Sequence, residues 1–258
     1  MTGTPEIRSR EGTIDLKEMT DARVSLGRFG SGQPTRVALQ FLLDHARARE
    51  AVWTTVDRAE LASQLLELGL ETINIQSRAD ERSVYIRRPD LGRCISQQST
   101  ELLRSVASKA PAEDVVIVVA DGLSSSAVTI NAVPLIEVLV PGLKRLGLTV
   151  CPIVLAAQAR VAIADPIGEA FGSRIAIVLI GERPGLSAAD SLGAYITYRP
   201  KTGTQDSDRN CVSNIREAGL PIDIAAENII QLVQDIIRTS VSGVALKSAL
   251  VALDFANC

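Results

Sequence analysis

The sequence predicts an α/β protein, in which a mostly parallel sheet is flanked by helices and is preceded by a smaller, mainly helical N-terminal region. Two uninterrupted aliphatic runs, at residues 115–120 and 175–180, are typical of strands that helices cover on both faces. Segments with apolar residues at helical spacing lie between such runs. Strands that alternate with helices in this way pair in parallel through right-handed crossovers, so the expected architecture is Rossmann-like.

The N-terminal part of the chain is expected to be mainly helical. Residues 1–19 are polar and weakly patterned, and we interpret them as a flexible arm. Asp57 with Glu60 three residues later forms a capping-box pattern that starts one helix. Apolar residues at 73, 75 and 84–86 indicate a short strand or a hairpin around a polar turn. The helices of this part are expected at residues 34–52, 57–69 and 96–107.

From about residue 112 onward the pattern is that of the α/β domain. Pro134 and Pro141 punctuate a helical region that runs to about residue 146. Asp165 is expected to cap a short helix, with Pro166 at the first helical position, where proline is tolerated. Strands are expected at 115–120, 149–155, 175–180 and 194–198, and the last clear helix at 222–238. The predicted organisation is an arm at 1–19, a helical region at 20–111 and the α/β domain at 112–258.

Composition and charge argue against several classes of function. The net charge of -3 lacks the basic surplus of nucleic-acid-binding proteins, and only 3% of the residues are aromatic, which leaves few side chains for base stacking. We find neither an uninterrupted apolar segment of transmembrane length nor a signal-peptide core, and the four widely spaced cysteines fit reduced thiols. We therefore expect a cytoplasmic protein with no nucleic-acid or membrane partner.

The single histidine, His45, restricts the chemistry further. A Ser-His-Asp relay or a multi-histidine metal site would have to be built around this one residue. His45 lies in the polar part of a predicted helix, where a surface or interface histidine is the simpler interpretation. We therefore predict neither a catalytic residue nor a metal-ligating residue in this chain.

The loop that follows the aliphatic run at 175–180 is the first candidate site. Ligands of open α/β sheets lie outside the carboxyl ends of the strands, and this run ends in Gly181, Glu182 and Arg183. A charged residue at the end of a buried strand needs a partner. Glu182 is positioned to accept hydrogen bonds from the amide groups of a ligand. The simpler alternative is a strand exit with a solvated ion pair.

Other candidate chemistry has simpler interpretations. The loops after the strands lack the G-x-G-x-x-G spacing, which disfavours a stand-alone nucleotide-binding enzyme. The paired carboxylates Asp165 with Glu169 fit a helix cap and a solvated loop better than an acid–base pair, as do Asp206 and Asp208. Cys211 is either a small packing residue or a nucleophile, and packing is favoured because no group near it in sequence would lower the pKa of its thiol.

Two groups of arginines stand out in the N-terminal half. Arg23 and Arg28 form the first group, and Arg87, Arg88 and Arg93 form the second. The first group either contacts a partner or is part of a surface loop. The second is either part of a solvated loop or a contact with an acidic partner surface or an anion. Arginine suits interface pairing because its planar fork binds carboxylates bidentately.

Several long motifs occur in one order along most of the chain. They lie at residues 22–28, 44–49, 87–93, 116–123, 181–186, 190–195, 209–215 and 242–244. With these motifs the chain resembles the small (light) subunit of ethanolamine ammonia-lyase, from about residue 20 to residue 246. The first 19 residues and the segment at 248–258 lie outside the resemblance.

The resemblance implies a subunit of an adenosylcobalamin-dependent lyase that converts ethanolamine to acetaldehyde and ammonia. It implies that a large subunit holds the substrate, and that this chain caps the cobalamin at the interface between the two. The cofactor contacts of the family fall on Val161, Glu182 and Cys211, as binding rather than catalytic residues. The two arginine groups then become candidate contacts with the large subunit. A purely structural or assembly subunit is the alternative, and both the cytoplasm and a bacterial microcompartment stay open as locations.

Overall fold

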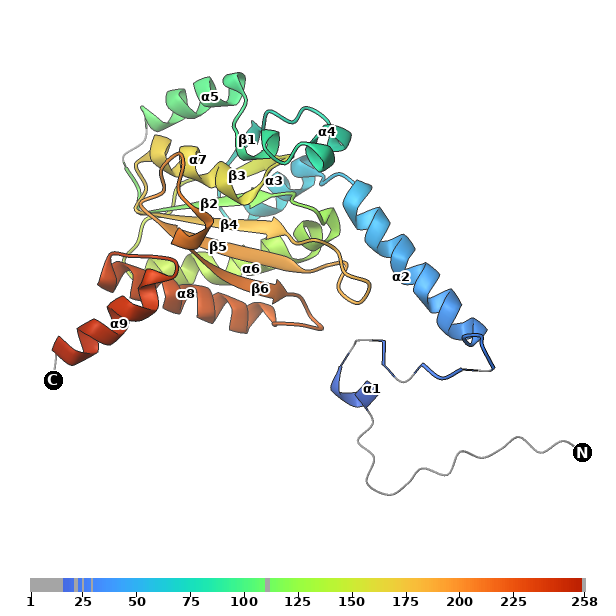
Figure 1. Ribbon diagram of the computed structural model, residues 1–258. Coiled ribbons are helices and arrows are strands. Elements are labelled where there is room, and N and C mark those ends of the chain that lie inside the picture. Colours follow the sequence, from blue (N-terminus) through green and yellow to red (C-terminus); the bar gives the residue numbers. More distant parts are fainter. Residues whose placement is uncertain (1–15, 21–22, 25, 29, 110–111, 257–258) are drawn as a thin grey trace, which may run out of the picture. The chain divides into compact units, whose positions relative to one another are not determined.

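The computed structural model describes residues 16–20, 23–24, 26–28, 30–109 and 112–256 (Figure 1). The chain divides into two compact units, Met1–Ala46 and Arg47–Cys258. Most of the predicted arm at 1–19 lies outside the described residues. The expected three-part organisation with boundaries at 19 and 111 stays a prediction.

The first unit contains α1 (Leu16–Met19) and most of α2 (Thr35–Trp53), whose bounds agree with the helix expected at 34–52. Arg23 forms a salt bridge with Asp44, and the Arg23 guanidinium lies 4.9 Å from the centre of the Phe41 ring. Large apolar side chains of α2 are exposed to solvent, among them Leu39 at 61% and Leu42 at 60%. A helix with this exposure gains little stability from packing within the chain.

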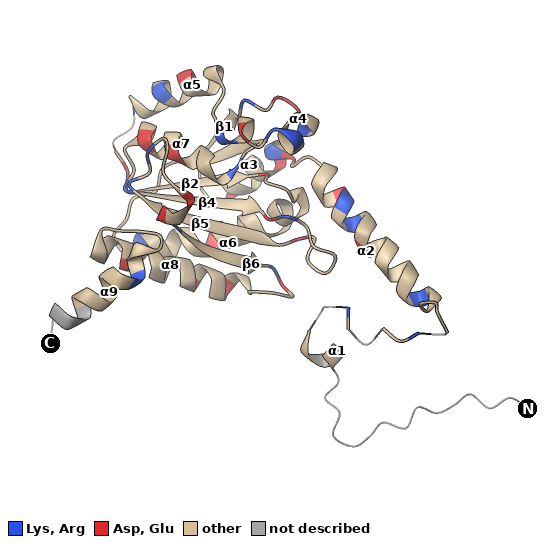
Figure 2. Cartoon of the chain, in the orientation of Figure 1, with Lys and Arg blue, Asp and Glu red and all other residues tan. Residues whose placement is uncertain are grey.

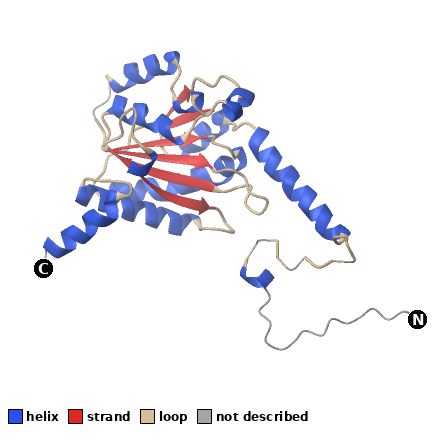
Figure 3. Ribbon diagram, viewed as in Figure 1, coloured by secondary structure: helices blue, strands red, loops and turns tan. Residues whose placement is uncertain are grey.

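The second unit is built on a six-stranded sheet in the order β1-β3-β2-β4-β5-β6 (Figures 1 and 3). The strands are β1 (Thr72–Gln76), β2 (Val115–Ala120), β3 (Ile153–Ala157), β4 (Ile175–Gly181), β5 (Leu192–Tyr198) and β6 (Arg209–Ile215). The first four are mutually parallel, and β5 is antiparallel to both of its neighbours. The predicted class, an α/β fold with a mostly parallel sheet and a helical N-terminal region, is confirmed. The sheet takes strands from both sides of the predicted boundary near residue 111.

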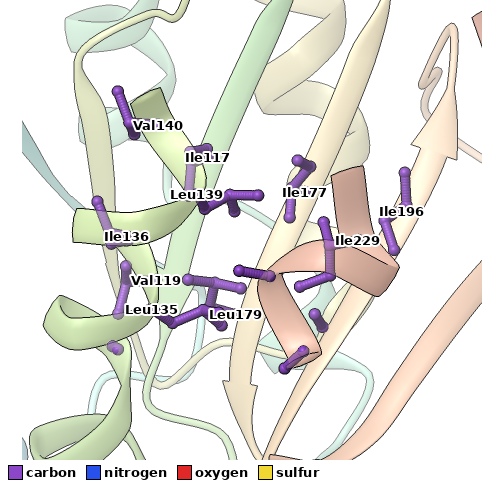
Figure 4. Packing of buried hydrophobic residues seen from close by; sticks show 14 of the residues in the cluster. Ile117, Val119, Leu135, Ile136, Leu139, Val140, Ile177, Leu179, Ile196 and Ile229 are labelled. Carbon is purple, nitrogen blue, oxygen red and sulfur yellow. The ribbon is translucent and has the colours of Figure 1, made fainter. Parts of the chain in front are cut away.

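Helices cover both faces of this sheet. They are α3 (Arg58–Glu67), α4 (Arg82–Arg87), α5 (Gln97–Ala107), α6 (Ser125–Arg145), α7 (Ala164–Phe171), α8 (Ile222–Thr239) and α9 (Ala245–Ala256), with short 3-10 turns at η1 (Leu91–Arg93), η2 (Val161–Ile163) and η3 (Asp206–Asp208). On one face, alternate residues of the strands pack against α6 and α8. Figure 4 shows this core, where side chains of β2 and β4 such as Val119 and Leu179 meet Leu135 of α6 and Ile229 of α8. The other residues of β2 and β4 pack against α7.

Helix α6 is continuous through Pro134 and Pro141. It is also the one helix among the described residues that is long and apolar enough to cross a membrane by length and composition. In this fold it is a core helix, because it packs on the sheet and against α8.

Several local predictions were wrong. The short strand expected at residues 73 and 75 is confirmed as β1, but the run at 84–86 lies in α4 and belongs to neither a strand nor a hairpin. β1 pairs in parallel with β3, and Tyr85 is buried with its hydroxyl donating to the Ala159 carbonyl at 3.0 Å. Strand β3 begins at Ile153 instead of residue 149, because Pro152 has no N–H to donate to a ladder.

The capping role predicted for Asp165 was also wrong. The turn η2 precedes α7, so the helical backbone is already established before Asp165, and the Asp165 carboxylate accepts hydrogen bonds from Arg209 instead.

Strand β5 is antiparallel because its connection to β4, at 182–191, contains no crossover helix.

Strands β5 and β6 are covered unevenly on their two faces. Helix α8 packs on both of them, and Ala194, Ile196 and Val212 point into that core. On the opposite face Thr197 and Arg209 are buried beside Asp165 of α7, whereas Tyr195 is half-buried and Cys211 is exposed, so the face is open at these last two residues. This open sheet face adjoins the candidate site.

Candidate functional site

A cavity of about 550 Å³ lies at the carboxyl ends of β2, β3 and β4, on the α7 side of the sheet. Its wall includes Leu123 from the loop after β2, Val161 from η2 and Glu182 from the loop after β4. The segments after β1 and the start of β6 complete it. This is the edge at which open α/β sheets bind ligands. Two of the three predicted cofactor contacts, Val161 and Glu182, therefore line one cavity.

Two glycines allow the loops after β2 and β4 to approach each other. The Leu123 N–H donates to the Gly181 carbonyl at 2.9 Å. A Cβ on Gly181 would lie 2.0 Å from the Ser124 carbonyl oxygen. A Cβ on Gly122, whose φ is +57°, would lie 2.2 Å from the Gly181 oxygen. The close approach places the backbone of Glu182 at the cavity wall.

Glu182 is held by the antiparallel part of the sheet. Its amide N–H donates to the Ser191 carbonyl at 3.0 Å, and its carboxylate accepts from the Ser191 hydroxyl and from the Asn214 N–H at 3.2 Å. A Cβ on Gly193 would lie 3.1 Å from the Glu182 carboxylate, so the strand opposite must be small at this point. Glu182 is therefore not a solvated residue at a strand exit. Its carboxylate has a defined orientation in the cavity.

Arg160 and Tyr85 form the part of the wall beside Val161. The Arg160 guanidinium stacks on the Tyr85 ring, 4.3 Å from the ring centre, and the Arg160 amide N–H donates to the Gly92 carbonyl at 2.8 Å. Burial raises the pKa of Tyr85, so the phenol stays neutral. Arg160 Nε is buried without a hydrogen-bond acceptor in the described part of the chain.

Cys211 lies beside the cavity on the open face of β5 and β6. Its Cα pairs with that of Tyr195, which lines the cavity. Cys211 is exposed, so the packing role within this chain that we expected for it was wrong. Although the residue as a whole is exposed, partial desolvation of its thiol raises the pKa of that thiol, which keeps it protonated near neutral pH and argues against a nucleophile. Burial also raises the pKa of Tyr195, to about 12.

A buried ion pair anchors the start of β6. Arg209 donates to both carboxylate oxygens of Asp165, at 2.7 Å each, and to the Thr197 hydroxyl at 3.1 Å. Burial lowers the pKa of Arg209, but the hydrogen bonds to Asp165 outweigh burial and the net shift is upward. The pair joins α7 to β6 and so supports the strand that carries Cys211.

The three arginines of the group at 87–93 lie in different surroundings. Arg93 lines the cavity, with Asp206 at 3.9 Å, whereas Arg88 forms an exposed pair with Asp90 at 2.7 Å. Arg87 donates to the Ser83 carbonyl of its own helix. Figure 2 shows the basic residues on α4 and in the segment that follows it. Contact of either arginine group with a second chain stays a prediction.

A smaller cavity of about 170 Å³ lies on the α3 side of the same strand ends. Its buried carboxylate, Asp121, already accepts from the N–H groups of Gln158 and Ala159 at 2.8 and 2.9 Å, and Arg82 lies 3.7 Å away. Burial raises the pKa of Asp121. The role of Asp121 is to stabilise the turn after β3 through these hydrogen bonds, so we take the larger cavity as the candidate site.

No group of three or more His, Cys, Asp or Glu side chains that could hold a metal ion occurs among the described residues.

Sequence reasoning missed the residues that approach the site from a distance. Tyr85, Arg160 and Tyr195 come from three different elements, and their patterns gave no signal. The pointers available were the place of Tyr195 in the motif at 190–195, the place of Arg160 directly before Val161, and the motif at 87–93, which follows Tyr85. The chemistry of the site is now defined: an apolar wall, a fixed carboxylate and several arginines beside an open sheet face.

Comparisons with known proteins agree with one another. Residues 10–247 match the family described as Ethanolamine ammonia-lyase light chain (EutC). The Ethanolamine ammonia-lyase small subunit of Bradyrhizobium diazoefficiens is 48% identical over 239 residues, which cover 92% of this chain and 91% of that protein. The protein of the same name from Rhodopseudomonas palustris is 47% identical over 244 residues, 95% of this chain and 92% of its own length. That of Pseudomonas syringae pv. tomato is 45% identical over 235 residues, 91% and 82% respectively.

Proposed function

The chain belongs to the ethanolamine ammonia-lyase light-chain family, and from that premise we propose that it is the small subunit of an ethanolamine ammonia-lyase. In this proposal it caps adenosylcobalamin at the interface with a large subunit that holds the substrate. When bound, the cofactor supplies the radical chemistry of the deamination, while this chain binds and orients it. The single observation that carries the proposal is the cavity that Val161 and Glu182 line together, beside the open face that presents Cys211.

The residues present fit a corrinoid. A corrin has an apolar ring edge and many carboxamides. Val161 and Leu123 provide apolar contact, and Glu182 provides an acceptor for an amide N–H. Cobalamin is larger than a 550 Å³ cavity, so the cavity and the open face would cover only part of it. A second chain is needed to cover the rest, which supports a cofactor shared between subunits.

Exposed surface supports the partner as well. The apolar side chains of α2, which include Leu39 and Leu42, are of the type that an obligate partner covers. We assign this surface and the arginines Arg23 and Arg28 to contact with the large subunit.

A cytoplasmic location, with packing inside a microcompartment as the alternative, belongs to the same proposal and rests on the family likeness.

Reconstitution tests the proposal. The chain alone should release no acetaldehyde from ethanolamine, and activity should appear only with the large subunit and adenosylcobalamin. Absence of activity with a large subunit that is active with another small subunit would contradict the assignment.

A second measurement separates cofactor capping from a purely structural role. Glu182→Ala and Cys211→Phe should weaken cobalamin binding to the assembled heteromer, as measured by equilibrium dialysis. Cys94→Phe is the matched control, because Cys94 is also exposed but lies neither in the cavity wall nor on the open face of β5 and β6. Unchanged affinity in both site variants, with assembly intact, would favour the structural subunit.

A further inference from the structure

The candidate cavity carries an excess of positive charge that its own acidic residues do not balance. Its charged lining consists of Arg93, Arg160, Arg183 and Arg209 against Glu182 and Asp206. Arg209 is neutralised by Asp165, with two hydrogen bonds of 2.7 Å. The Glu182 carboxylate is directed to Ser191 and Asn214 and not to an arginine.

Asp206 cannot neutralise the remaining arginines. It is shared between Arg209, 3.4 Å away, and Arg93, 3.9 Å away, and its side chain is 73% exposed. Arg160 and Arg183 form no salt bridge with a carboxylate in the described part of the chain. Since arginine stays charged at every physiological pH, the cavity favours an anion.

Arg160 is the best-positioned of these arginines. Its Cγ is confined by Gly92, where an added Cβ would lie 3.0 Å away, and its guanidinium stacks on the Tyr85 ring. The Tyr85 hydroxyl is itself fixed by the Ala159 carbonyl. A guanidinium held in this way loses little conformational freedom on binding.

The hydrogen bonding of Arg160 is incomplete. Its Nε is buried and has no acceptor in the described part of the chain. A buried N–H without an acceptor costs about 1–3 kcal/mol, so such groups are normally satisfied. An acceptor brought by a ligand would remove that cost, and a phosphate oxygen pair matches the guanidinium fork.

We propose that Arg160, assisted by Arg183 and Arg93, binds the phosphodiester of the cobalamin nucleotide loop. The inference rests on the proposed function and adds to it an anion subsite within the same cavity. The phosphodiester is the anionic group of the cobalamin periphery, whereas the corrin carboxamides are neutral. The Arg160 side chain therefore distinguishes a complete cobalamin from a corrinoid that lacks the nucleotide loop.

The test compares two ligands on the assembled heteromer. Cobinamide keeps the corrin and its carboxamides but lacks the phosphodiester, ribose and base. Arg160→Gln should weaken the binding of cobalamin roughly ten- to hundredfold, as expected for the loss of a charge-assisted hydrogen bond, and leave cobinamide binding within about twofold. Binding is measured by equilibrium dialysis with absorbance detection, which does not depend on catalysis.

Three controls define the result. Arg104→Gln removes an arginine of α5 that does not line the cavity, and should change neither affinity. Arg160→Lys keeps the charge without the fork and should give an intermediate loss for cobalamin. Cobinamide phosphate restores the phosphate without the base, and its affinity should also fall in Arg160→Gln. Size-exclusion chromatography confirms that each heteromer is assembled.

The outcomes separate the inference from the function on which it rests. A parallel loss of cobalamin and cobinamide affinity would mean that Arg160 binds a carboxamide, and would overturn the phosphodiester subsite alone. The subsite is likewise overturned if cobinamide phosphate binds to the Arg160→Gln heteromer as tightly as to wild type. It is also overturned if the wild-type heteromer binds inorganic phosphate but the ratio of cobalamin to cobinamide affinity is the same in wild type and in Arg160→Gln. A wild-type heteromer that binds neither corrinoid would overturn the proposed function itself.

Discussion

The contact between the loops after β2 and β4 yields the sharpest stability prediction. In Gly181→Ala the new Cβ would lie 2.0 Å from the Ser124 oxygen and 2.8 Å from the Asp121 oxygen, which are both backbone atoms. Neither atom can rotate away, so the end of β4 must separate from the start of α6. Overpacking of this kind costs about 1–3 kcal/mol, and loss of the hydrogen bond from Leu123 to Gly181 adds about 1 kcal/mol.

We therefore expect Gly181→Ala to lower the free energy of unfolding by about 2–4 kcal/mol. At roughly 3 °C per kcal/mol for a chain of this size, Tm should fall by about 6–12 °C. Urea titration followed by circular dichroism measures the first quantity, and thermal denaturation measures the second.

Gly185→Ala is the matched control for this prediction. Gly185 lies in the same loop, but the nearest atom to its added Cβ is 3.9 Å away. It should change the free energy of unfolding by less than about 0.5 kcal/mol. Equal stability of the two variants, or a Gly181→Ala protein within about 0.5 kcal/mol of wild type, would refute the close-approach argument.

Three further predictions concern charged and titratable groups. Asp165→Asn should destabilise the chain by roughly 3–5 kcal/mol in urea titration, because Arg209 is left as a buried charge, and the double variant Asp165→Leu/Arg209→Met should lose less than either single change. Burial raises the pKa of Asp114, but the hydrogen bonds from Thr149 and the ion pair with Arg174 outweigh burial, so the folded pKa of Asp114 lies below 3.8. The ionised Asp114 therefore stabilises the fold above its unfolded pKa, and this contribution is lost as the pH falls through the folded pKa. Asp114→Asn should be less stable than wild type at pH 7 by under about 1 kcal/mol, and the difference in stability should close below pH 3.8. A difference that does not change with pH would contradict the interaction of Asp114 with Arg174 and Thr149. Because its pKa is raised, Cys211 should react with iodoacetamide at pH 8 more slowly than a thiol in an unstructured peptide. Mass spectrometry of the labelled site measures the rate, and a rate equal to that of the peptide thiol would contradict the raised pKa.

Local pattern was sufficient for the central part of the fold. The strands at Val115–Ala120 and β4 are continuous aliphatic runs whose residues are all buried, so their sequence alone identifies them. Asp57 caps α3 by accepting from the N–H groups of Ala59 and Glu60, as its place before an apolar stripe predicts. Such signals depend on neighbours in sequence, which is why they were found.

Elements whose partners are distant in sequence were not found. β6 carries Arg209, Asn210 and Cys211, and its buried residues lie at 209, 212 and 215 instead of at every second position, so no alternating pattern marks it as a strand. It is a strand because β5 supplies its ladder and α8 covers one of its faces. The run at 84–86 in α4 was mistaken for part of a short strand or a hairpin for the same reason, since the burial of Tyr85 depends on Ala159 and Arg160.

The sequence by itself determined the class of fold, the family and the position of Glu182 at the end of a buried strand, because aliphatic runs and ordered motifs are local properties of the chain. Only the tertiary structure brought Val161 and Glu182 to one cavity, exposed Cys211 beside it and stacked Arg160 on Tyr85. These contacts join residues tens of positions apart, and sheet order and loop path decide them. Sheet order in turn depends on the packing of both faces at once, which no single stretch of sequence encodes.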